Sequence, residues 1–447
     1  MRPCALPGID GAAYCGALAV PENARHPQGR WLSIQFAVLP ATDGPALPDP
    51  IVPLPGGPGE AIIAAAAPFA ERLASLRGDR DVLLVDVRGT GRSDALHCDL
   101  HADADVQTRL RHLLPPEAAR QCATAMQSRA DLDQYTYAHV AQDLERLRRA
   151  LGYGPLNLYA GSYGTRAAQV FVRMYPGSAR TVYMGSVVPL DVPTPLTMAK
   201  TAQGEFEHVL RACASDVACR TAFPRVREEF AAVMASLDAG EVRVAMPDAK
   251  DEATLSRGRV AEWFRARLYR PSDGAELPWL VHRAHEGDST PIANGILDNA
   301  AGMASALSVG FFLTMTCRED VAFIAEDDIG PATRGTFLGD YRVREQMAAC
   351  EAWPKAALPE GYRERVRSAV PTLFVSGEND AASPAWFTQR VAPGFANRVE
   401  IVSRHQGHTE WSGCVEEAYR RLVRDGSVRD IATRTCADAP VPVFRVK

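Results

Sequence analysis

The chain has 447 residues, of which 47% are hydrophobic and 23% are charged, and its formal net charge at neutral pH is -5. These values are ordinary for a globular protein that buries a large core. The acidic balance and the lack of a basic run argue against a nucleic-acid partner. No apolar stretch approaches the ~20 residues that a membrane-spanning helix needs, so we expect no membrane span.

The ten cysteines are arranged as close neighbours in sequence: Cys4 with Cys15, Cys98 with Cys122, Cys213 with Cys219, Cys317 with Cys350, and Cys414 with Cys436. This pattern favours disulfides and an oxidising compartment over free thiols in the cytosol, although spacing alone leaves the connectivity open. Paired Cys-x-x-Cys motifs are missing, so we expect no metal. No leader peptide is visible at the start of the chain, and we expect a secreted or periplasmic protein.

The first part of the chain predicts three strands and one helix. Residues 31–39 alternate between apolar and polar side chains, which indicates a half-buried strand. Residues 51–54 form a short apolar strand, and a helix is expected from about Glu60 to Arg77. Residues 82–87 are continuously apolar up to Asp86, which is typical of a strand inside a parallel sheet.

The same rhythm continues in the next segment. Residues 137–151 carry apolar side chains at helical spacing, and a strand is expected at 156–159. A second helix is predicted at 165–174 and a further strand at 181–188. Strands that alternate with helices in this way predict a parallel sheet with helices on both faces.

The pattern then becomes mostly helical, with candidate helices at 199–213, 226–237, 260–268 and 278–286. A helical insert between sheet strands predicts a lid over the sheet. The strand pattern resumes at 372–375 and 399–402. We therefore expect a first core segment at 1–190, a helical cap at 191–312 and a second core segment at 313–447.

Ser162 is the candidate nucleophile, in the segment Ala160-Gly161-Ser162-Tyr163-Gly164. A serine hydroxyl is a weak nucleophile unless a base activates it and a tight turn holds it clear of its own backbone. The flanking residues must be small, and Ala160 stands where the usual pattern has its first glycine. A predicted strand before the turn and a helix after it raise this motif above a chance match.

Asp380 and His408 each follow a predicted strand, and they are the candidate acid and base. Glu378 is the alternative acid and His405 the alternative base; His408 is preferred because Gly407 gives its loop freedom. Serine, acid and histidine in this chain order are typical of the α/β-hydrolase fold. We expect that fold, with a mostly parallel central sheet and a helical cap insertion.

The segment Pro55-Gly56-Gly57-Pro58-Gly59 follows a strand and has little side chain to obstruct a substrate. Acyl transfer requires hydrogen-bond donors for the oxyanion that develops on the carbonyl. We expect the backbone N–H groups of Gly57 and Tyr163 to supply them.

These motifs resemble those of the prolyl iminopeptidase and tripeptidyl aminopeptidase family of α/β-hydrolases, and the chain looks closest to the tripeptidyl branch. The glycine-rich segment is similar to the family's His-Gly-Gly-Pro-Gly loop, with Pro55 in place of the histidine. The other similar segments are 86–93, 160–165, 317–320 and 377–380, and the resemblance spans about 31–411.

The resemblance implies a secreted or periplasmic enzyme that cleaves short peptides from a free N-terminus, with Ser162, Asp380 and His408 as its triad. Such an enzyme needs a carboxylate for the substrate's ammonium group, whose desolvation the ion pair must offset. Glu319 and Asp320 are the candidates, since they follow the insert and adjoin Cys317. The alternatives are Glu60, Glu205 and Glu207, and a solvated surface acid is an equally good explanation for each of these five.

The sequence thus predicts a monomeric serine exopeptidase without a cofactor, acting on a peptide or small-molecule substrate. One alternative is an esterase or lactonase on small secreted metabolites, because one fold carries both activities. Another is a non-catalytic binding protein on a hydrolase scaffold.

Overall fold

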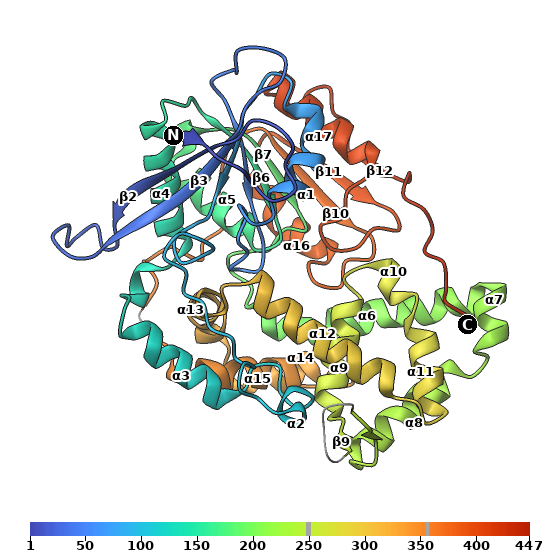
Figure 1. Cartoon of the computed structure of the whole chain (residues 1–447). Helices are drawn as coiled ribbons and strands as arrows, with labels where there is room; N and C mark the ends of the chain where they lie inside the picture. Colours follow the sequence, from blue (N-terminus) through green and yellow to red (C-terminus); the bar gives the residue numbers. More distant parts are fainter. Residues whose placement is uncertain (247–251, 355–356) are drawn as a thin grey trace.

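The alternating strands and helices build one twisted sheet with helices on both faces, and a separate group of helices lies beneath it in the view of Figure 1. The computed structural model describes residues 1–246, 252–354 and 357–447. Ten strands form the main sheet of these described residues, in the order β1-β2-β3-β5-β4-β6-β7-β10-β11-β12. From β5 to β12 neighbouring strands are parallel, whereas the pairs β1·β2, β2·β3 and β3·β5 are antiparallel. The expected mostly parallel sheet is confirmed.

The strands of this sheet are short and mostly buried: β1 Arg2–Pro3, β2 Tyr14–Pro21, β3 Trp31–Leu39, β4 Ile51–Leu54, β5 Val82–Val85, β6 Leu156–Gly161, β7 Ala179–Gly185, β10 Thr372–Gly377, β11 Arg398–Ser403 and β12 Arg434–Cys436. Successive side chains of a strand point to opposite faces, so a central strand that is buried on both faces contributes to two cores. Leu158 belongs to the core under α4 and α5, and its neighbour Tyr159 belongs to the core under α1 and α17.

The helices that flank the sheet are α1 Ala66–Arg72, α4 Tyr137–Ala150, α5 Gly164–Met174, α16 Ala385–Val391 and α17 Gly413–Asp425. Helices α4 and α5 pack against each other, and α5 contacts β6 and β7. Helix α17 covers the opposite face, where it contacts β10 and β7. Only two residues, 162 and 163, therefore separate β6 from a helix that is fixed on the sheet.

The helices beneath the sheet in Figure 1 are α6 Thr194–Ser215, α7 Val217–Ala222, α8 Val226–Asp238, α9 Arg257–Arg267, α10 Pro271–Gly274, α11 Leu277–His285 and α12 Thr290–Ala306. All of these except α10 contribute side chains to a core of their own. Helices α13 Val309–Glu319, α14 Glu326–Thr333 and α15 Tyr341–Ala349 follow, and α14 and α15 pack on α6. Two earlier helices, α2 Val106–Arg109 and α3 Pro116–Gln127, lie at this end too. A small antiparallel pair, β8 Arg243–Val244 and β9 Ala253–Thr254, flanks residues 247–251.

Some element ends differ from those that the sequence predicts. The helix expected from Glu60 to Arg77 is confined to 66–72, because Glu60 pairs its backbone with Leu307 and the Ile63 N–H donates to Asp86. The strand expected at 82–87 ends at residue 85, where the buried loop that follows begins. In the first case tertiary hydrogen bonds replace the local pattern.

All ten cysteines are paired as sequence neighbours, in the disulfides Cys4–Cys15, Cys98–Cys122, Cys213–Cys219, Cys317–Cys350 and Cys414–Cys436. The predicted disulfide framework is confirmed. In the described ranges no helix has both the length and the apolar content needed to cross a membrane.

Candidate active site

The candidate site lies where the strand order of the sheet changes direction. After β4 the chain crosses to β5 on one side, and after that it returns to β6 on the other side of β4. Leu54 at the end of β4 pairs with Ala160 near the end of β6. The loops that follow these strands therefore meet at the carboxyl edge, where ligands of open α/β sheets bind.

Ser162 occupies the turn between β6 and α5 with a left-handed backbone, at φ 51°. Few residues other than glycine adopt this conformation, and it lifts the side chain off the sheet edge. The turn is held because α5 begins close to β4: a Cβ at Gly164 would collide with the backbone carbonyls of Leu54 and Pro55. A small residue is thus required at position 164, as the motif predicts.

The side chains of Ser162, His408 and Asp380 form one hydrogen-bonded series. The His408 Nε2 lies 2.8 Å from the Ser162 Oγ, and its Nδ1 lies 3.0 and 3.1 Å from the two Asp380 carboxylate oxygens. The Asp380 Oδ1 also accepts hydrogen bonds from the backbone N–H groups of Ala382 and Ser383. Because the Asp380 side chain is fully buried and anchored, it fixes the plane of the imidazole.

The alternative acid and base lie apart from this series. Glu378 is exposed, and its carboxylate accepts from the backbone N–H of His405. The structure brings neither Glu378 nor His405 into the pocket around Ser162.

The backbone N–H groups of Gly57 and Tyr163 have no partner among the described residues, and both residues line the pocket that also contains Ser162. The glycine loop lies directly on the nucleophile, since a Cβ at Gly56 would be 2.9 Å from the Ser162 Cβ. Gly57 itself has φ 103°, which favours glycine. Gly57 and Tyr163 remain the predicted oxyanion donors.

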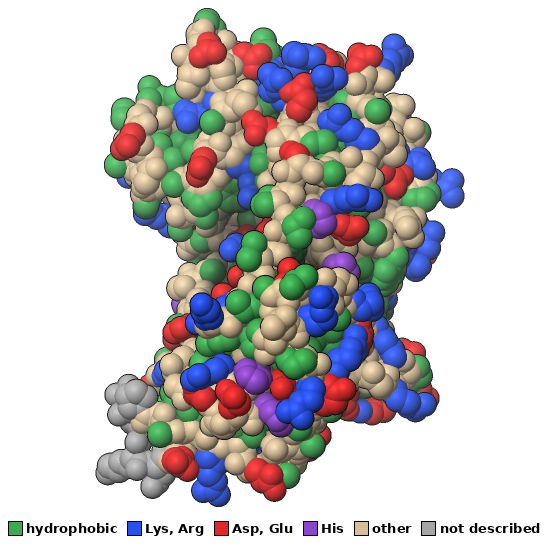
Figure 2. Space-filling view, turned by 90° about the vertical axis from the view of Figure 1, so that its right-hand side faces the viewer, with side chains coloured by type: hydrophobic (Ala, Val, Ile, Leu, Met, Phe, Trp, Pro, Cys, Tyr) green, Lys and Arg blue, Asp and Glu red, His purple; other side chains and the backbone are tan. Residues whose placement is uncertain are grey.

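The helices α6 to α15 beneath the sheet in Figure 1, called the cap from here on, reach the same loops from the opposite side. The Ser308 N–H donates to the Gly59 carbonyl at 2.9 Å, next to the backbone bridge between Glu60 and Leu307. The link between α12 and α13 therefore holds the glycine loop in place. Figure 2 shows the two parts of the molecule meeting at a narrower waist.

A second cap contact fixes the histidine. The His408 N–H donates to the Tyr269 carbonyl at 2.7 Å, and the rings of these two residues pack with their centroids 5.0 Å apart. A Cβ at Gly407 would collide with the Tyr269 carbonyl and with Pro271. Gly407 thus lets the cap approach the His408 loop closely. The sequence suggests another reason for this glycine, namely freedom of the loop.

A cavity of about 640 Å³ lies between the sheet edge and the cap. Its walls include Ser162, His408, Gly57 and Tyr163 from the sheet side. The cap contributes both polar and apolar side chains, among them Glu262, Arg265, Tyr269, Asn299, Met303 and Leu307. The volume is in the range of sites that enclose small ligands.

Two families match the chain. The one described as alpha/beta hydrolase fold matches residues 49–222, and the one described as TAP-like protein matches residues 335–436. The chain has the α/β-hydrolase fold. The expected resemblance and fold are thereby confirmed, as is the prediction that the protein is an enzyme.

Three curated proteins illustrate the relationship of this α/β-hydrolase. It is 27% identical to the serine protease Hip1 of Mycobacterium tuberculosis over 419 residues, which cover 84% of this chain and 78% of Hip1. It is 29% identical to the putative hydrolase YuaR of Escherichia coli over 413 residues, covering 85% and 79%. It is 23% identical to the tripeptidyl aminopeptidase of Streptomyces coelicolor over an alignment of 474 positions, which covers 96% of this chain and 84% of that protein.

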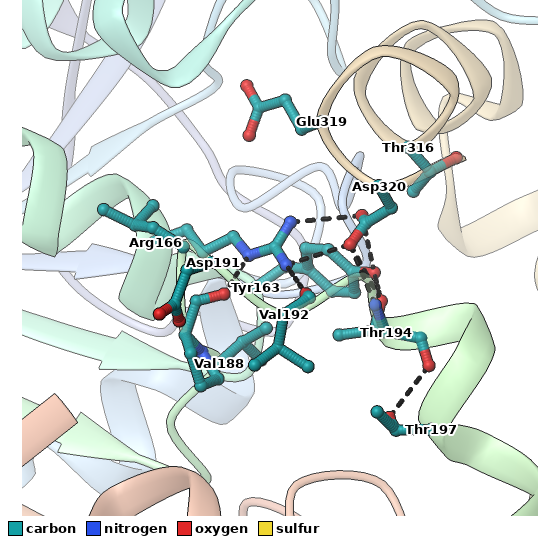
Figure 3. Close-up of polar contacts among 12 residues, drawn as sticks. Tyr163, Arg166, Val188, Asp191, Val192, Thr194, Thr197, Thr316, Glu319 and Asp320 are labelled. Carbon is teal, nitrogen blue, oxygen red and sulfur yellow. Dashed lines mark hydrogen bonds and ion pairs between the residues drawn. The ribbon is translucent and has the colours of Figure 1, made fainter. Parts of the chain in front are cut away.

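The two acids expected to bind a substrate amine, Glu319 and Asp320, do not line the pocket of this α/β-hydrolase. Asp320 is fully buried and forms a bidentate ion pair with Arg166, while its oxygens also accept from the Tyr163 hydroxyl and the Thr194 N–H. Figure 3 shows this carboxylate enclosed by its partners. The structure therefore corrects that expectation: Asp320 joins the elements around it and has no capacity left for a ligand.

Glu319 is buried too, and burial raises the pKa of its carboxyl to about 7. Its Oε1 accepts from the Tyr362 hydroxyl at 2.6 Å and from the Tyr137 N–H at 3.3 Å, whereas its Oε2 has no partner among the described residues. A carboxyl in such surroundings favours its neutral form. Glu319 is therefore a core residue, and in Figure 3 its side chain points away from Asp320.

Of the three alternative acids, Glu60 alone lines the pocket. Protein atoms surround it on most sides although it remains accessible through the cavity, and this desolvation raises the pKa of its carboxyl, which the Gly56 N–H and His408 partly oppose. Glu205 accepts from the Asn379 amide, and Glu207 pairs with Arg227 at 2.7 Å.

Three charged residues of the pocket carry no signal in the sequence, namely Glu262 and Arg265 of α9 and Arg342 of α15. Glu262 receives two hydrogen bonds from Arg265, at 2.7 and 2.8 Å. Arg342 lies 77 positions after Arg265 in the sequence, and neither helix carries a local motif. Only their packing against each other identifies them as part of the site.

Proposed function

We propose that this α/β-hydrolase is a serine exopeptidase that removes short units from the free N-terminus of peptides. The observation that carries the proposal is the hydrogen-bonded series of Ser162, His408 and Asp380 at the floor of a capped pocket. The relatives named serine protease Hip1 and tripeptidyl aminopeptidase support a peptide substrate. The five disulfides support a secreted or periplasmic location, and we expect a monomer.

In the acylation step, the Ser162 Oγ attacks the scissile carbonyl while the His408 Nε2 takes the hydroxyl proton. The Asp380 carboxylate stabilises the imidazolium that forms. The N–H groups of Gly57 and Tyr163 donate to the oxyanion. The tetrahedral intermediate then collapses, the carbon–nitrogen bond breaks, and the imidazolium gives its proton to the leaving amine.

In the deacylation step, a water molecule takes the place of the leaving amine. The His408 Nε2 removes one proton from this water as its oxygen attacks the acyl carbon. Collapse of the second intermediate breaks the bond to the Ser162 Oγ, which recovers its proton from the imidazolium. The released peptide unit carries a new carboxylate, and the enzyme returns to its starting state.

Recognition of the free N-terminus is assigned in this proposal to Glu60. It lines the same pocket as Ser162 and has no ion pair among the described residues. An ammonium group would offset the desolvation of the carboxylate, which a neutral ligand would not do. The cap, which closes over the site through Tyr269 and Leu307, would exclude folded proteins and admit chain ends.

The test compares aminoacyl and tripeptidyl anilides, with and without an acetylated N-terminus, and neutral p-nitrophenyl esters. The proposal predicts cleavage of the free-amine anilides and a large loss on acetylation. Ester hydrolysis without cleavage of any anilide would favour the esterase alternative instead. Labelling with a fluorophosphonate tests the nucleophile, and a Ser162→Ala variant serves as the unlabelled reference. If the natural chain is not labelled at Ser162, the nucleophile is misassigned.

A further inference from the structure

Arg342, in the first turn of α15, is a buried cation that lines the same pocket as Ser162. Its side chain is only 8% exposed. Among the residues that the structure describes, its guanidinium donates no hydrogen bond, and its Nε is buried without a partner. Its sole ion pair in these ranges is a 3.7 Å approach of Nη1 to Glu262, which is too long for a hydrogen bond.

The carboxylate of Glu262 is already committed to another cation. Arg265 binds both of its oxygens at 2.7 and 2.8 Å in fork-to-fork geometry, which makes it the closer partner of this carboxylate. Arg342 therefore faces the cavity with most of its five donors unused. A buried guanidinium in this state is costly unless a ligand completes its hydrogen bonds.

The other charges around the cavity leave Arg342 as the best anion partner. Arg72 donates to the Tyr159 hydroxyl and the Thr409 carbonyl, and Arg270 is exposed to solvent. The cavity is lined by four arginines and two acids, Glu60 and Glu262, so its formal balance is positive before His408 is counted. A substrate that brings only an ammonium group would not balance this pocket.

We propose that Arg342 recognises a carboxylate of the substrate, so that the enzyme prefers short peptides that are anionic at a position away from the scissile bond. The planar guanidinium matches a carboxylate through two parallel hydrogen bonds. The carboxylate has two possible sources, an acidic side chain or the C-terminus of a short peptide. This proposal relies on the proposed function only in that Ser162 attacks the substrate in this pocket.

The experiment uses matched substrate pairs that differ in one carboxylate: Asp against Asn, Glu against Gln, and a C-terminal acid against its amide. The expected kcat/KM ratio within the preferred pair is roughly ten- to hundredfold for the natural chain, as one charged hydrogen-bonded contact provides. Preference in the first two pairs identifies a side chain as the source, and preference in the third identifies the C-terminus. In Arg342→Gln the ratio should fall close to one, and in Arg342→Lys it should be partly kept.

Arg344→Gln is the matched control, because Arg344 lies two positions further on α15 and pairs with the exposed Glu326. It should keep the ratio of the natural chain. A ratio near one in the natural chain, or an unchanged ratio in Arg342→Gln, would overturn the proposal. If Arg342→Gln does not fold, inhibition of the natural chain by carboxylate products against their amides gives the same decision.

A further pair separates this proposal from the exopeptidase assignment. The p-nitrophenyl half-ester of a dicarboxylic acid is compared with a neutral ester of the same length, so that no peptide bond is needed. Preference for the half-ester without any peptide cleavage would support the role of Arg342 while rejecting the peptidase. Peptide cleavage without a carboxylate preference in any pair would do the reverse.

Discussion

Arg166 and Asp320 form a buried, two-pronged ion pair that joins the helix of the nucleophile to the cap. The Arg166 Nη1 and Nη2 lie 3.1 and 2.9 Å from the two carboxylate oxygens, and both side chains are at most 1% exposed. Arg166 belongs to α5, whereas Asp320 ends α13 and also accepts from the Thr194 N–H where α6 begins. Figure 3 shows how one carboxylate thereby ties together three helices.

Replacement of Asp320 by Asn should destabilise the protein by about 3–5 kcal/mol, because it leaves the Arg166 guanidinium buried and uncompensated. Urea unfolding at neutral pH measures this change. The control is Asp340→Asn, an exposed acid in a surface ion pair, for which a change below about 0.5 kcal/mol is expected. A similar, small effect in both variants would contradict the structural role of the pair.

Replacement of Asp380 by Asn should lower kcat by roughly 10⁴-fold with little change in fold, since the amide would favour the wrong tautomer of His408. Turnover of a chromogenic substrate measures the loss. Glu378 is exposed and lies two residues before Asp380, so the Glu378→Gln variant should keep a kcat close to that of the natural enzyme. If Glu378→Gln were the more damaging change, the acid of the series would be misassigned.

Replacement of Glu60 by Gln should reduce kcat/KM for free-amine peptides by roughly ten- to hundredfold, since the ammonium group loses its charged partner. The effect should appear mainly in KM and should be absent for N-acetylated or ester substrates. Because burial raises the pKa of Glu60, the natural enzyme should lose peptide affinity on acidification at a higher pH than an ordinary glutamate would predict. Glu207→Gln, whose carboxylate pairs with Arg227, is the control.

Replacement of Gly407 by Ala should lower activity by roughly 10²-fold. The added methyl would collide with the Tyr269 carbonyl and push the His408 loop out of position. A stability loss of about 1–3 kcal/mol is expected from the same collision. Kinetics and thermal unfolding together measure both effects. The control is Gly204→Ala, where the added methyl meets no atom within 4 Å. This variant should lower neither the activity nor the stability.

Replacement of Glu205 by Gln should stabilise the protein at alkaline pH. Burial raises the pKa of the Glu205 carboxyl to about 8, and the charges of Asp380 and Glu378 add to the shift while the Asn379 amide opposes it. The neutral Glu205 carboxyl contributes its full stabilisation of the folded protein below the pKa of the unfolded chain, near 4.3. This contribution to the unfolding free energy is lost as the pH rises through the raised folded-state pKa.

The glutamine keeps the hydrogen bond from Asn379 but cannot ionise. Its unfolding free energy should therefore equal that of the natural chain near pH 4 and exceed it by at least about 1 kcal/mol at pH 9, since one pKa unit corresponds to about 1.4 kcal/mol. Urea unfolding at several pH values measures the difference. A constant difference across this range would mean that the Glu205 carboxyl titrates normally.

The local signals of the sequence determined the strands and the turn of the nucleophile. The apolar run at 156–159, the small residues around Ser162 and the helix that follows act over neighbouring positions, so the pattern alone predicted them. The chain order of serine, acid and histidine predicted the fold for the same reason, because each residue follows its own strand. The cysteine neighbours also proved to be partners, since short loops close most readily.

The tertiary structure alone decided which acids can reach a ligand. Glu319 and Asp320 are adjacent to a suggestive cysteine in the sequence, yet their partners come from residues more than 40 positions away and enclose them. Glu60 and Arg342 carry no motif, and they share one cavity only because the cap folds back over the glycine loop. Burial and ion pairing depend on long-range packing, which the spacing of residues along the chain does not encode.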